Sequence, residues 1–165
     1  MIIRRLSIGE LGIVTELAHV IWPPTFKDIL SPEQLTYMLN WMYSEGTLRE
    51  QLENGHEFFV MEISGRPVGF MGIEAHYPQK QYLKVHKLYV LPETQGSGAG
   101  RKFIDKAVEL AKEKGISVLT LNVNRFNKAV DFYFRMGFKV EKEEDIDIGN
   151  GYLMEDYVMS LPVTR

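Results

Sequence analysis

Glycine occupies every second position of the segment Gly96-Ser97-Gly98-Ala99-Gly100, which lies between Gln95 and Arg101. From Arg101 onward, apolar residues recur at steps of three and four, which predicts a helix over residues 98–114. The first N–H groups of a helix have no internal acceptors, and the helix dipole makes that end positive. Glycines let an anion come close to these groups. The segment therefore predicts a phosphate or pyrophosphate site, and the alternative is a tight turn with surface cations.

Two common phosphate-binding loops do not fit this segment. A Walker loop requires Gly-x-x-x-x-Gly-Lys followed by Ser or Thr, and the chain contains no such string. A dinucleotide fingerprint requires Gly-x-Gly-x-x-Gly directly after a strand. Here the glycines alternate, and residues 91–95 separate them from the strand that we expect at residues 85–90.

A third pattern matches well. The string Gln95-x-x-Gly98-x-Gly100, after a strand ending in Leu88-Tyr89-Val90, resembles the acetyl-CoA signature of the GNAT superfamily of N-acetyltransferases. The segment 127–138 resembles the second signature of that family, with Asn127, a helical turn containing alanine, and Tyr133 followed by Gly137-Phe138. The resemblance covers about residues 58–161. Two motifs in this order are far more specific than either alone.

This resemblance implies an enzyme, an acyltransferase that takes acetyl-CoA as its acetyl donor. By carry-over, the donor contacts the residues that match the first signature and its preceding strand, namely Leu88, Val90, Gln95, Gly96, Ser97, Gly98, Ala99, Gly100 and Arg101. Leu88 and Val90 would act through the main chain, the Leu88 N–H on the acetyl carbonyl and Val90 on the pantetheine arm. Their side chains are expected in the core.

The second signature supplies two further site residues. Asn127 matches the asparagine that contacts the cofactor arm, and its other interpretation is a helix N-cap. Tyr133 matches the tyrosine whose hydroxyl lies near the CoA sulfur, where it would protonate the leaving thiolate. Its other interpretation is an aromatic core residue with a bonded hydroxyl.

Acetyl transfer also needs a neutral amine, and an alkyl ammonium with a pKa of ~10.4 must first lose a proton. His86 stands on the expected strand two residues before Leu88, so both lie on one face, and imidazole is a suitable base. The alternatives are a His86 that merely bonds a neighbour, with Glu74, His76 or a water chain as the base.

Composition limits the function further. The chain has 165 residues, of which 45% are hydrophobic and 25% charged, so we expect a single N-acetyltransferase domain over residues 1–165. A net charge of -3 argues against nucleic acid as partner. No cysteine is present, which excludes disulfides and thiolate metal ligands, and the histidine spacing predicts no metal site. We see no signal peptide or membrane span and expect a cytoplasmic protein.

Periodicity places the remaining elements. Helical patterns precede Trp22-Pro23-Pro24, which should break the first helix, and follow Ser31-Pro32, with a third short candidate at residues 47–52. The strands are expected at residues 2–6, 57–63, 67–75, 85–90, 116–123, 138–148 and 152–161, with helices at residues 98–114 and 127–136. This order predicts an α/β (α+β) fold with a mixed sheet and helices on both faces. The resemblance makes that sheet mostly antiparallel, with strands that splay apart near residues 90 and 123.

The acceptor is the least constrained feature. Thr25-Phe26 followed by Ser31-Pro32-Glu33 resembles the bacterial polyamine acetyltransferase subgroup. Four carboxylates near the last hairpin would form an acidic rim for a cationic amine, or only a solvated strand face: Asp145, Asp147, Glu155 and Asp156. We expect acetyl-CoA and a small-molecule amine as partners and leave a homodimer open. The alternatives are a protein N-terminus or lysine as acceptor, or a non-catalytic acyl-CoA sensor.

Overall fold

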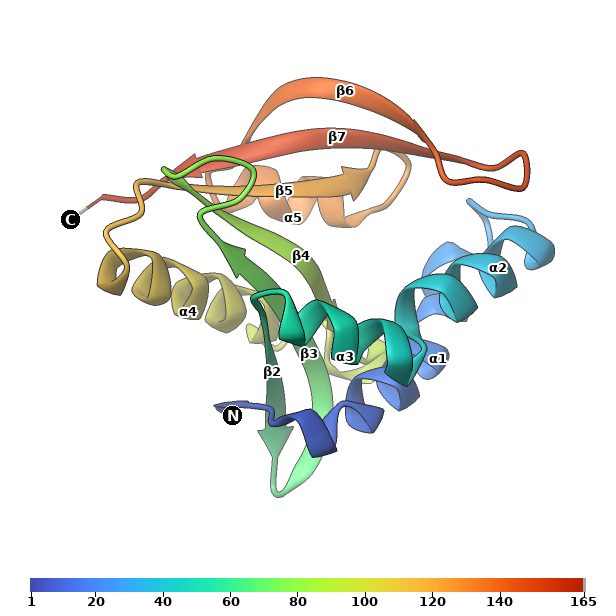
Figure 1. Cartoon of the computed structure of the whole chain (residues 1–165), viewed down its shortest axis with the longest axis horizontal. Coiled ribbons are helices and arrows are strands. Elements are labelled where there is room, and N and C mark those ends of the chain that lie inside the picture. Colours follow the sequence, from blue (N-terminus) through green and yellow to red (C-terminus); the bar gives the residue numbers. More distant parts are fainter. Residues whose placement is uncertain (165) are drawn as a thin grey trace. The chain divides into compact units, whose positions relative to one another are not determined.

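The computed structural model describes residues 1–164 and divides into two compact units (Figure 1). The first unit comprises Met1–Glu74 and His86–Lys106. The second unit comprises Ala75–Val85 and continues from Ala107 towards the C-terminus. Two strands and one helix contribute residues to both units, and each unit is described in turn.

Helices and strands follow the predicted order, with small differences at their ends. The helices are α1 (Gly12–Phe26), α2 (Pro32–Tyr43), α3 (Glu45–Glu53), α4 (Ala99–Glu113) and α5 (Ala129–Arg135), with 3₁₀ turns η1 (Ile8–Glu10) and η2 (Pro92–Thr94). The strands are β1 (Ile2–Arg5), β2 (His56–Ile63), β3 (Arg66–Ala75), β4 (Tyr82–Val90), β5 (Val118–Asn124), β6 (Lys139–Asp147) and β7 (Leu153–Pro162).

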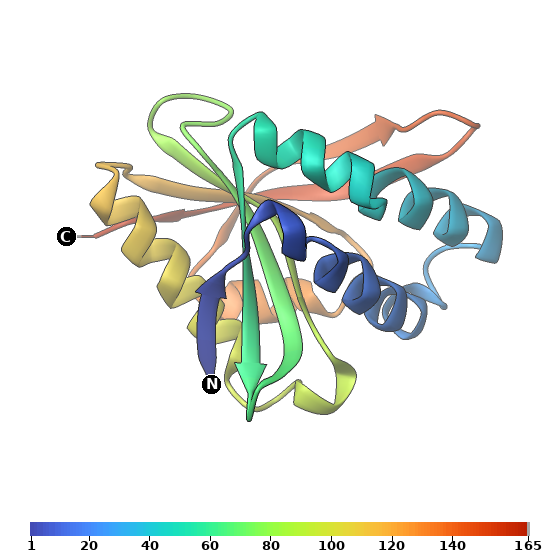
Figure 2. The ribbon, with the colours of Figure 1, turned by 60° about the horizontal axis from the view of Figure 1, so that its bottom comes forward.

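The first unit contains an antiparallel meander of β1, β2 and β3, in which β1 lies beside β2 (Figure 2). Ser64 and Gly65 join β2 to β3, and both have positive φ angles, 52° and 77°. Two such residues form the hairpin turn whose twist matches that of the flanking strands. The hairpin and a one-residue register shift between Met61 and Glu62 together place His56 opposite Glu74.

Helices cover both faces of these strands. On one face, the ring of Phe70 from β3 packs against Tyr43 of α2, with ring centroids 5.8 Å apart. On the other face, Phe103 of α4 packs close to Gly69. A Cβ added at Gly69 would lie only 3.2 Å from the Phe103 ring. Because adjacent strand residues point to opposite faces, β3 separates two helical layers.

The predicted helix break at Pro23-Pro24 is wrong, because α1 continues through both prolines to Phe26. Each proline removes one helical N–H, and the carbonyls left without a donor belong to the exposed residues His19 and Val20. Trp22 is 2% exposed, and its ring lies 4.6 Å from that of Phe26. Burial of these aromatic side chains holds the helix together across a sequence that would break an isolated one.

The other N-terminal helices begin as predicted or nearly so. Ser31 accepts a hydrogen bond from the Gln34 N–H at 3.1 Å, with Pro32 in the first turn of α2. Ser44 caps α3 in the same way through the Thr47 N–H. Both caps satisfy an N–H that has no helical acceptor.

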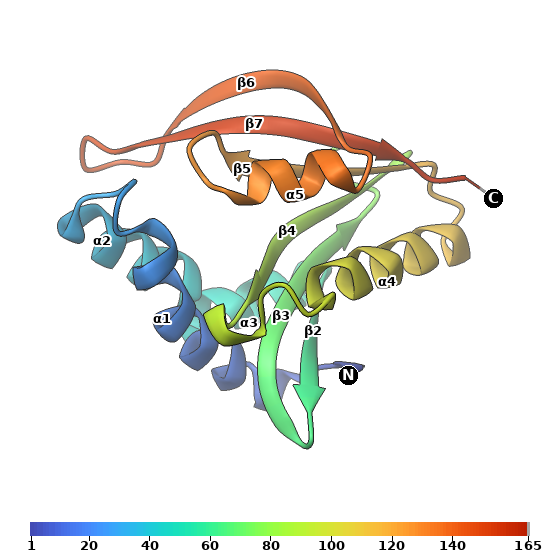
Figure 3. The ribbon, with the colours of Figure 1, turned by 180° about the vertical axis from the view of Figure 1, so that it is seen from behind.

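In the second unit, the first half of β4 pairs in parallel with β5, and β7 lies between β5 and β6 and pairs antiparallel with both. Helix α5 lies across one face of β5, as the view from behind shows (Figure 3). The β6–β7 hairpin turns at Gly149-Asn150-Gly151, where all three residues have positive φ. The glycine-containing turn predicted there is confirmed.

Together the strands have the order β1-β2-β3-β4-β5-β7-β6 in a seven-stranded sheet. The predicted α/β class, with a mixed and mostly antiparallel sheet and helices, is confirmed. The single-domain assignment stays a prediction. Within residues 1–164, no helix combines the length and apolarity needed to cross a membrane.

Candidate active site

The glycine-rich segment forms an open turn at the start of α4, as predicted. Gly96 and Gly98 have φ angles of 81° and 89°, a conformation that side chains with a Cβ rarely adopt. A Cβ at either position would meet no atom within 4 Å, so open space lies beside both glycines. The first helical bond runs from the Lys102 N–H to the Gly98 carbonyl at 3.1 Å.

The N–H groups of Ala99, Gly100 and Arg101 precede this first helical bond, so helical geometry gives them no internal acceptor. Arg101 is exposed beside them. An open turn of small residues, a helix N-terminus and an adjacent guanidinium fit the pyrophosphate of a CoA thioester. Gln95 holds the turn to the preceding strand, because its Nε2 lies 3.5 Å from the Val90 carbonyl.

The second half of β4 presents its residues alternately to two faces. Val90 is 9% exposed and lies in the core as expected, whereas Leu88 is only half-buried. His86 lies on the same face as Leu88, and Lys87 lies on the opposite one.

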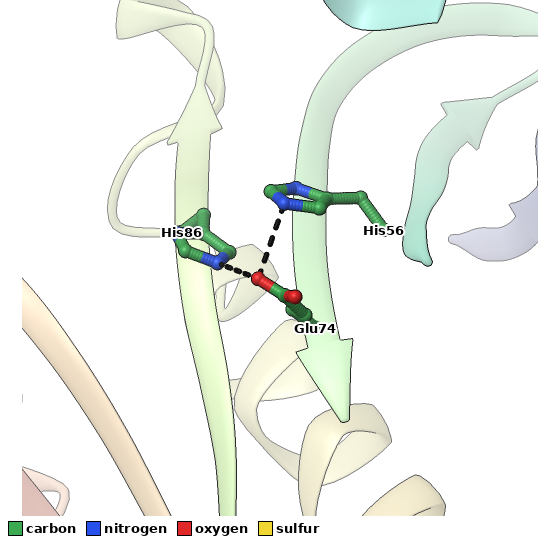
Figure 4. Close-up of side chains that lie close together, drawn as sticks. All are labelled: His56, Glu74 and His86. Atoms are coloured by element: carbon green, nitrogen blue, oxygen red, sulfur yellow. Dashed lines mark hydrogen bonds and ion pairs between the residues drawn. The ribbon is translucent and has the colours of Figure 1, made fainter. Parts of the chain in front are cut away.

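His86 is joined by two residues from the neighbouring strands (Figure 4). Its Nε2 lies 2.9 Å from Oε1 of Glu74 on β3. Nε2 of His56 on β2 lies 3.2 Å from the same oxygen, and the two imidazole rings stack with centroids 4.5 Å apart. Burial, together with the charge of Lys87, lowers the pKa of His56 to about 4. His86 and Glu74 are among the residues predicted from the sequence, whereas His56 is not, because only the β2–β3 register brings it to this cluster.

Two imidazoles and a carboxylate are donors that suit zinc, and their ligand atoms lie within 4.8 Å of one another. The ring geometry does not suit a shared ion. An imidazole lone pair lies in the plane of its ring, and these two planes are stacked at an angle of only 14°. One ion would therefore lie well outside the plane of at least one ring. The arrangement fits hydrogen bonding better, and the absence of a metal site stays a prediction.

His76, the other histidine considered near this strand, belongs to the second unit. It is exposed, and its Nδ1 lies 2.7 Å from the Lys80 carbonyl. Its function as a base stays a prediction with no support from these contacts.

Lys87 is a charged residue that the sequence analysis did not single out. Only 4% of it is exposed, and its Nζ donates to Oε1 of Gln51 on α3 at 2.9 Å. The ammonium also lies 5.6 Å and 5.8 Å from the ring centroids of Tyr43 and Phe58. Burial lowers the pKa of Lys87 to about 8. The alternating sequence pattern of a strand does not distinguish a buried lysine from an exposed one.

Asn127 and Tyr133 lie in the second unit. Oδ1 of Asn127 accepts a hydrogen bond from the Ala129 N–H at 3.0 Å, although the N-cap residue of α5 is Lys128 and not Asn127. Tyr133 is 7% exposed, and its ring packs edge-to-face on Phe132 and Phe138 at 5.2 Å and 5.5 Å. Burial raises the pKa of the Tyr133 phenol, which keeps its proton in place at neutral pH. The aromatic core role is thus present, and the acid role stays a prediction.

Most carboxylates of the expected acidic rim interact with other side chains of the protein. Arg125 Nη2 lies 2.8 Å from Asp145 and 3.5 Å from Glu155. Asp156 is 3% exposed and accepts from Asn122, and burial raises its pKa. These contacts favour a structural function for most of the rim.

Comparison with known proteins identifies the family. A model of the GNAT acetyltransferase domain matches residues 26–161. An uncharacterised N-acetyltransferase of Methanocaldococcus jannaschii is 38% identical over 91 residues, 52% of this chain and 40% of that protein. A spermidine N(1)-acetyltransferase of Thermoplasma acidophilum is 29% identical over 93% of this chain and 94% of that protein. A peptidyl-lysine N-acetyltransferase of Escherichia coli is 31% identical over 76% of this chain and 74% of that protein.

Among solved structures, the PaiA N-acetyltransferase of Thermoplasma acidophilum in complex with coenzyme A matches with a TM-score of 0.80 and 28% identity, over 98% of both chains. The chain therefore belongs to the GNAT family of acetyltransferases. It is an acyltransferase whose acetyl donor is acetyl-CoA. The predicted family, enzyme class and cofactor are confirmed, and the individual site residues remain proposals.

Gly98→Asp should remove most of the thermal stabilisation that CoA gives. We expect CoA to raise the Tm of the wild type, because a ligand bound only by the folded state stabilises it. Gly98→Asn is the matched control, since it imposes the same strain at a φ of 89° without a negative charge. Differential scanning fluorimetry with a CoA titration measures both, and equal losses in the two variants would show that charge at the turn is unimportant.

Lys87→Met should change how stability depends on pH. The pKa of Lys87 is about 8 in the folded protein and ordinary in the unfolded chain, about 10.4. The unfolded chain therefore binds more protons between these values, so Lys87 makes the free energy of unfolding rise with pH across that window. Urea unfolding at pH 7 and pH 10 should show this rise in the wild type relative to Lys87→Met. Lys27→Met, at an exposed lysine, should keep it; an identical pH dependence of wild type and Lys87→Met would contradict the burial of the charge.

Proposed function

We propose that this enzyme transfers the acetyl group of acetyl-CoA to a primary amine of a small polycation of the polyamine class. The observation that carries the proposal is similarity to a spermidine N(1)-acetyltransferase along nearly the whole of both chains. The N-terminal helices α1 and α2 fall within this similarity, and acceptor selection in this protein is assigned to them. Trp41 and Tyr37 of α2 stack on each other there, and Trp41 is 48% exposed.

The reaction needs three proton movements and one exchange of bonds. The donor supplies an acetyl thioester. His86 takes a proton from the acceptor ammonium, and the free amine then forms a C–N bond to the acetyl carbon. The Leu88 N–H stabilises charge on the carbonyl oxygen. As the C–S bond breaks, Tyr133 gives its phenol proton to the sulfur, and the extra proton on the acetylated nitrogen returns to the Tyr133 phenolate.

A second acceptor class has specific support. The peptidyl-lysine N-acetyltransferase of Escherichia coli is 31% identical over 76% of this chain. Lysine side chains and polyamines share an alkyl primary amine, so the same proton chemistry serves both. The difference lies in what surrounds the amine, which is a second cationic centre in a polyamine and a peptide backbone in a protein.

An acceptor series separates the two classes. Release of free CoA thiol should be measured with spermidine, a monoamine of equal length, and a lysine-containing peptide. We expect the highest kcat/KM for spermidine, because its second charge adds binding energy. A higher kcat/KM for the peptide would overturn the polyamine assignment in favour of a protein acceptor. No thiol release with any amine would overturn the proposed function as a whole.

Tyr133→Phe should lower kcat by about 10²-fold, the usual contribution of a general acid. The affinity for CoA should change little, because the ring and its packing on Phe132 and Phe138 remain. Steady-state kinetics and a CoA binding titration measure the two effects separately. A kcat within a factor of about two of wild type would show that Tyr133 is structural and that the thiolate leaves without it.

A further inference from the structure

One carboxylate oxygen of the first unit bridges the Nε2 atoms of two stacked imidazole rings. Glu74 on β3 stands directly opposite His56 on β2 in the strand register. Its Oε1 lies 3.2 Å from Nε2 of His56 and 2.9 Å from Nε2 of His86 on β4 (Figure 4). All three side chains are largely buried, with 13% to 20% of each exposed. Three adjacent strands thus contribute one residue each to a single polar cluster.

The hydrogen bond to Glu74 determines which ring nitrogen of His86 can accept a proton. An ionised carboxylate accepts hydrogen bonds and cannot donate one, so the facing Nε2 of His86 carries the hydrogen. The neutral ring then has its lone pair on Nδ1. Buried imidazoles are commonly oriented in this way, since the hydrogen bond made by one nitrogen sets the state of the other.

We propose that Glu74 is a positioning residue, whose carboxylate holds His86 through Nε2 and so presents Nδ1 as the atom that takes the acceptor's proton. This inference rests on the proposed function, in which His86 is the base. The carboxylate also stabilises the imidazolium that forms when Nδ1 is protonated, because opposite charges attract across the hydrogen bond.

His56 adjusts the strength of this contact. Its pKa of about 4 keeps it neutral at working pH, so it does not compete as a base. At 3.2 Å from the carboxylate, its Nε2 carries the hydrogen, and this N–H draws part of the charge of Oε1 away from His86. The stacked rings also fix the plane of His86. Lys87, next along β4, is the nearby cation whose charge also acts on His56.

Two substitutions should act in opposite directions. Glu74→Gln keeps the shape and an acceptor oxygen but removes the charge, so the titration midpoint of His86 should fall by about one pH unit. His56→Phe keeps a stacked ring but removes the N–H, so Glu74 interacts with His86 alone and the midpoint should rise. The acidic limb of kcat/KM should move with the midpoint in each variant.

The experiment is NMR on the full chain with ¹⁵N-labelled histidine, which reports the protonated nitrogen and the titration of each ring. His19 and His76 are exposed and serve as internal controls. In the wild type, we expect neutral His86 to carry its hydrogen on Nε2. A hydrogen on Nδ1, an unmoved His86 midpoint in Glu74→Gln, or shifts of the same sign in both variants would overturn the role of Glu74.

Acetyl transfer measured on the same samples separates this inference from the proposed function. NMR shifts as expected, without transfer to any amine by the wild type, would overturn the proposed function. Transfer by the wild type, together with an unmoved His86 midpoint in Glu74→Gln, would overturn only the positioning role. If the acidic limb of kcat/KM moves with the NMR titration midpoint of His86 in both variants, the result supports both the positioning role of Glu74 and the proposed function.

Discussion

Burial of the Lys87 ammonium is the interaction on which the packing of the first unit depends. The charge lies almost fully inside, and its hydrogen bond to Gln51 ties β4 to α3. The aromatic rings of Tyr43 and Phe58 bring α2 and β2 to the same point. A buried charge is tolerated only where such partners replace water, so these elements must keep their relative positions. The lowered pKa of Lys87 indicates that these partners compensate only in part for the water that the ammonium loses on burial.

The other face of the same strand carries the proposed base. Because neighbouring residues on a strand point to opposite sides, a lysine fixed inward turns His86 outward, towards Glu74 and His56. One residue of slippage in β4 would exchange these two environments. Strand register therefore governs both the stability of the unit and the orientation of the proposed base.

The proposed donor site depends on a different constraint, the N–H groups at the start of α4 that have no helical acceptor. Gly96 and Gly98 turn the chain with positive φ and leave the space beside it open. Only the short turn η2 separates this glycine-rich turn from β4, the strand that carries His86. The turn and His86 belong to the same unit. Tyr133 and Asn127 belong to the other unit, where Tyr133 packs among aromatic rings and Asn127 accepts a hydrogen bond at the start of α5. These local roles are present, and the roles of both residues in the reaction stay predictions.

The sequence by itself determined the family, the donor and most elements, because these depend on local signals. The glycine spacing of residues 96–100, the Ser31-Pro32 helix start and the turn at residues 149–151 each act within a few residues. Tertiary structure decided what depends on distant partners. Buried Trp22 carries α1 through Pro23-Pro24, Arg125 neutralises much of the expected acidic rim, and strand pairing brings His56 to Glu74. None of these is readable from spacing, since each is set by side chains that meet only after the strands and helices have packed.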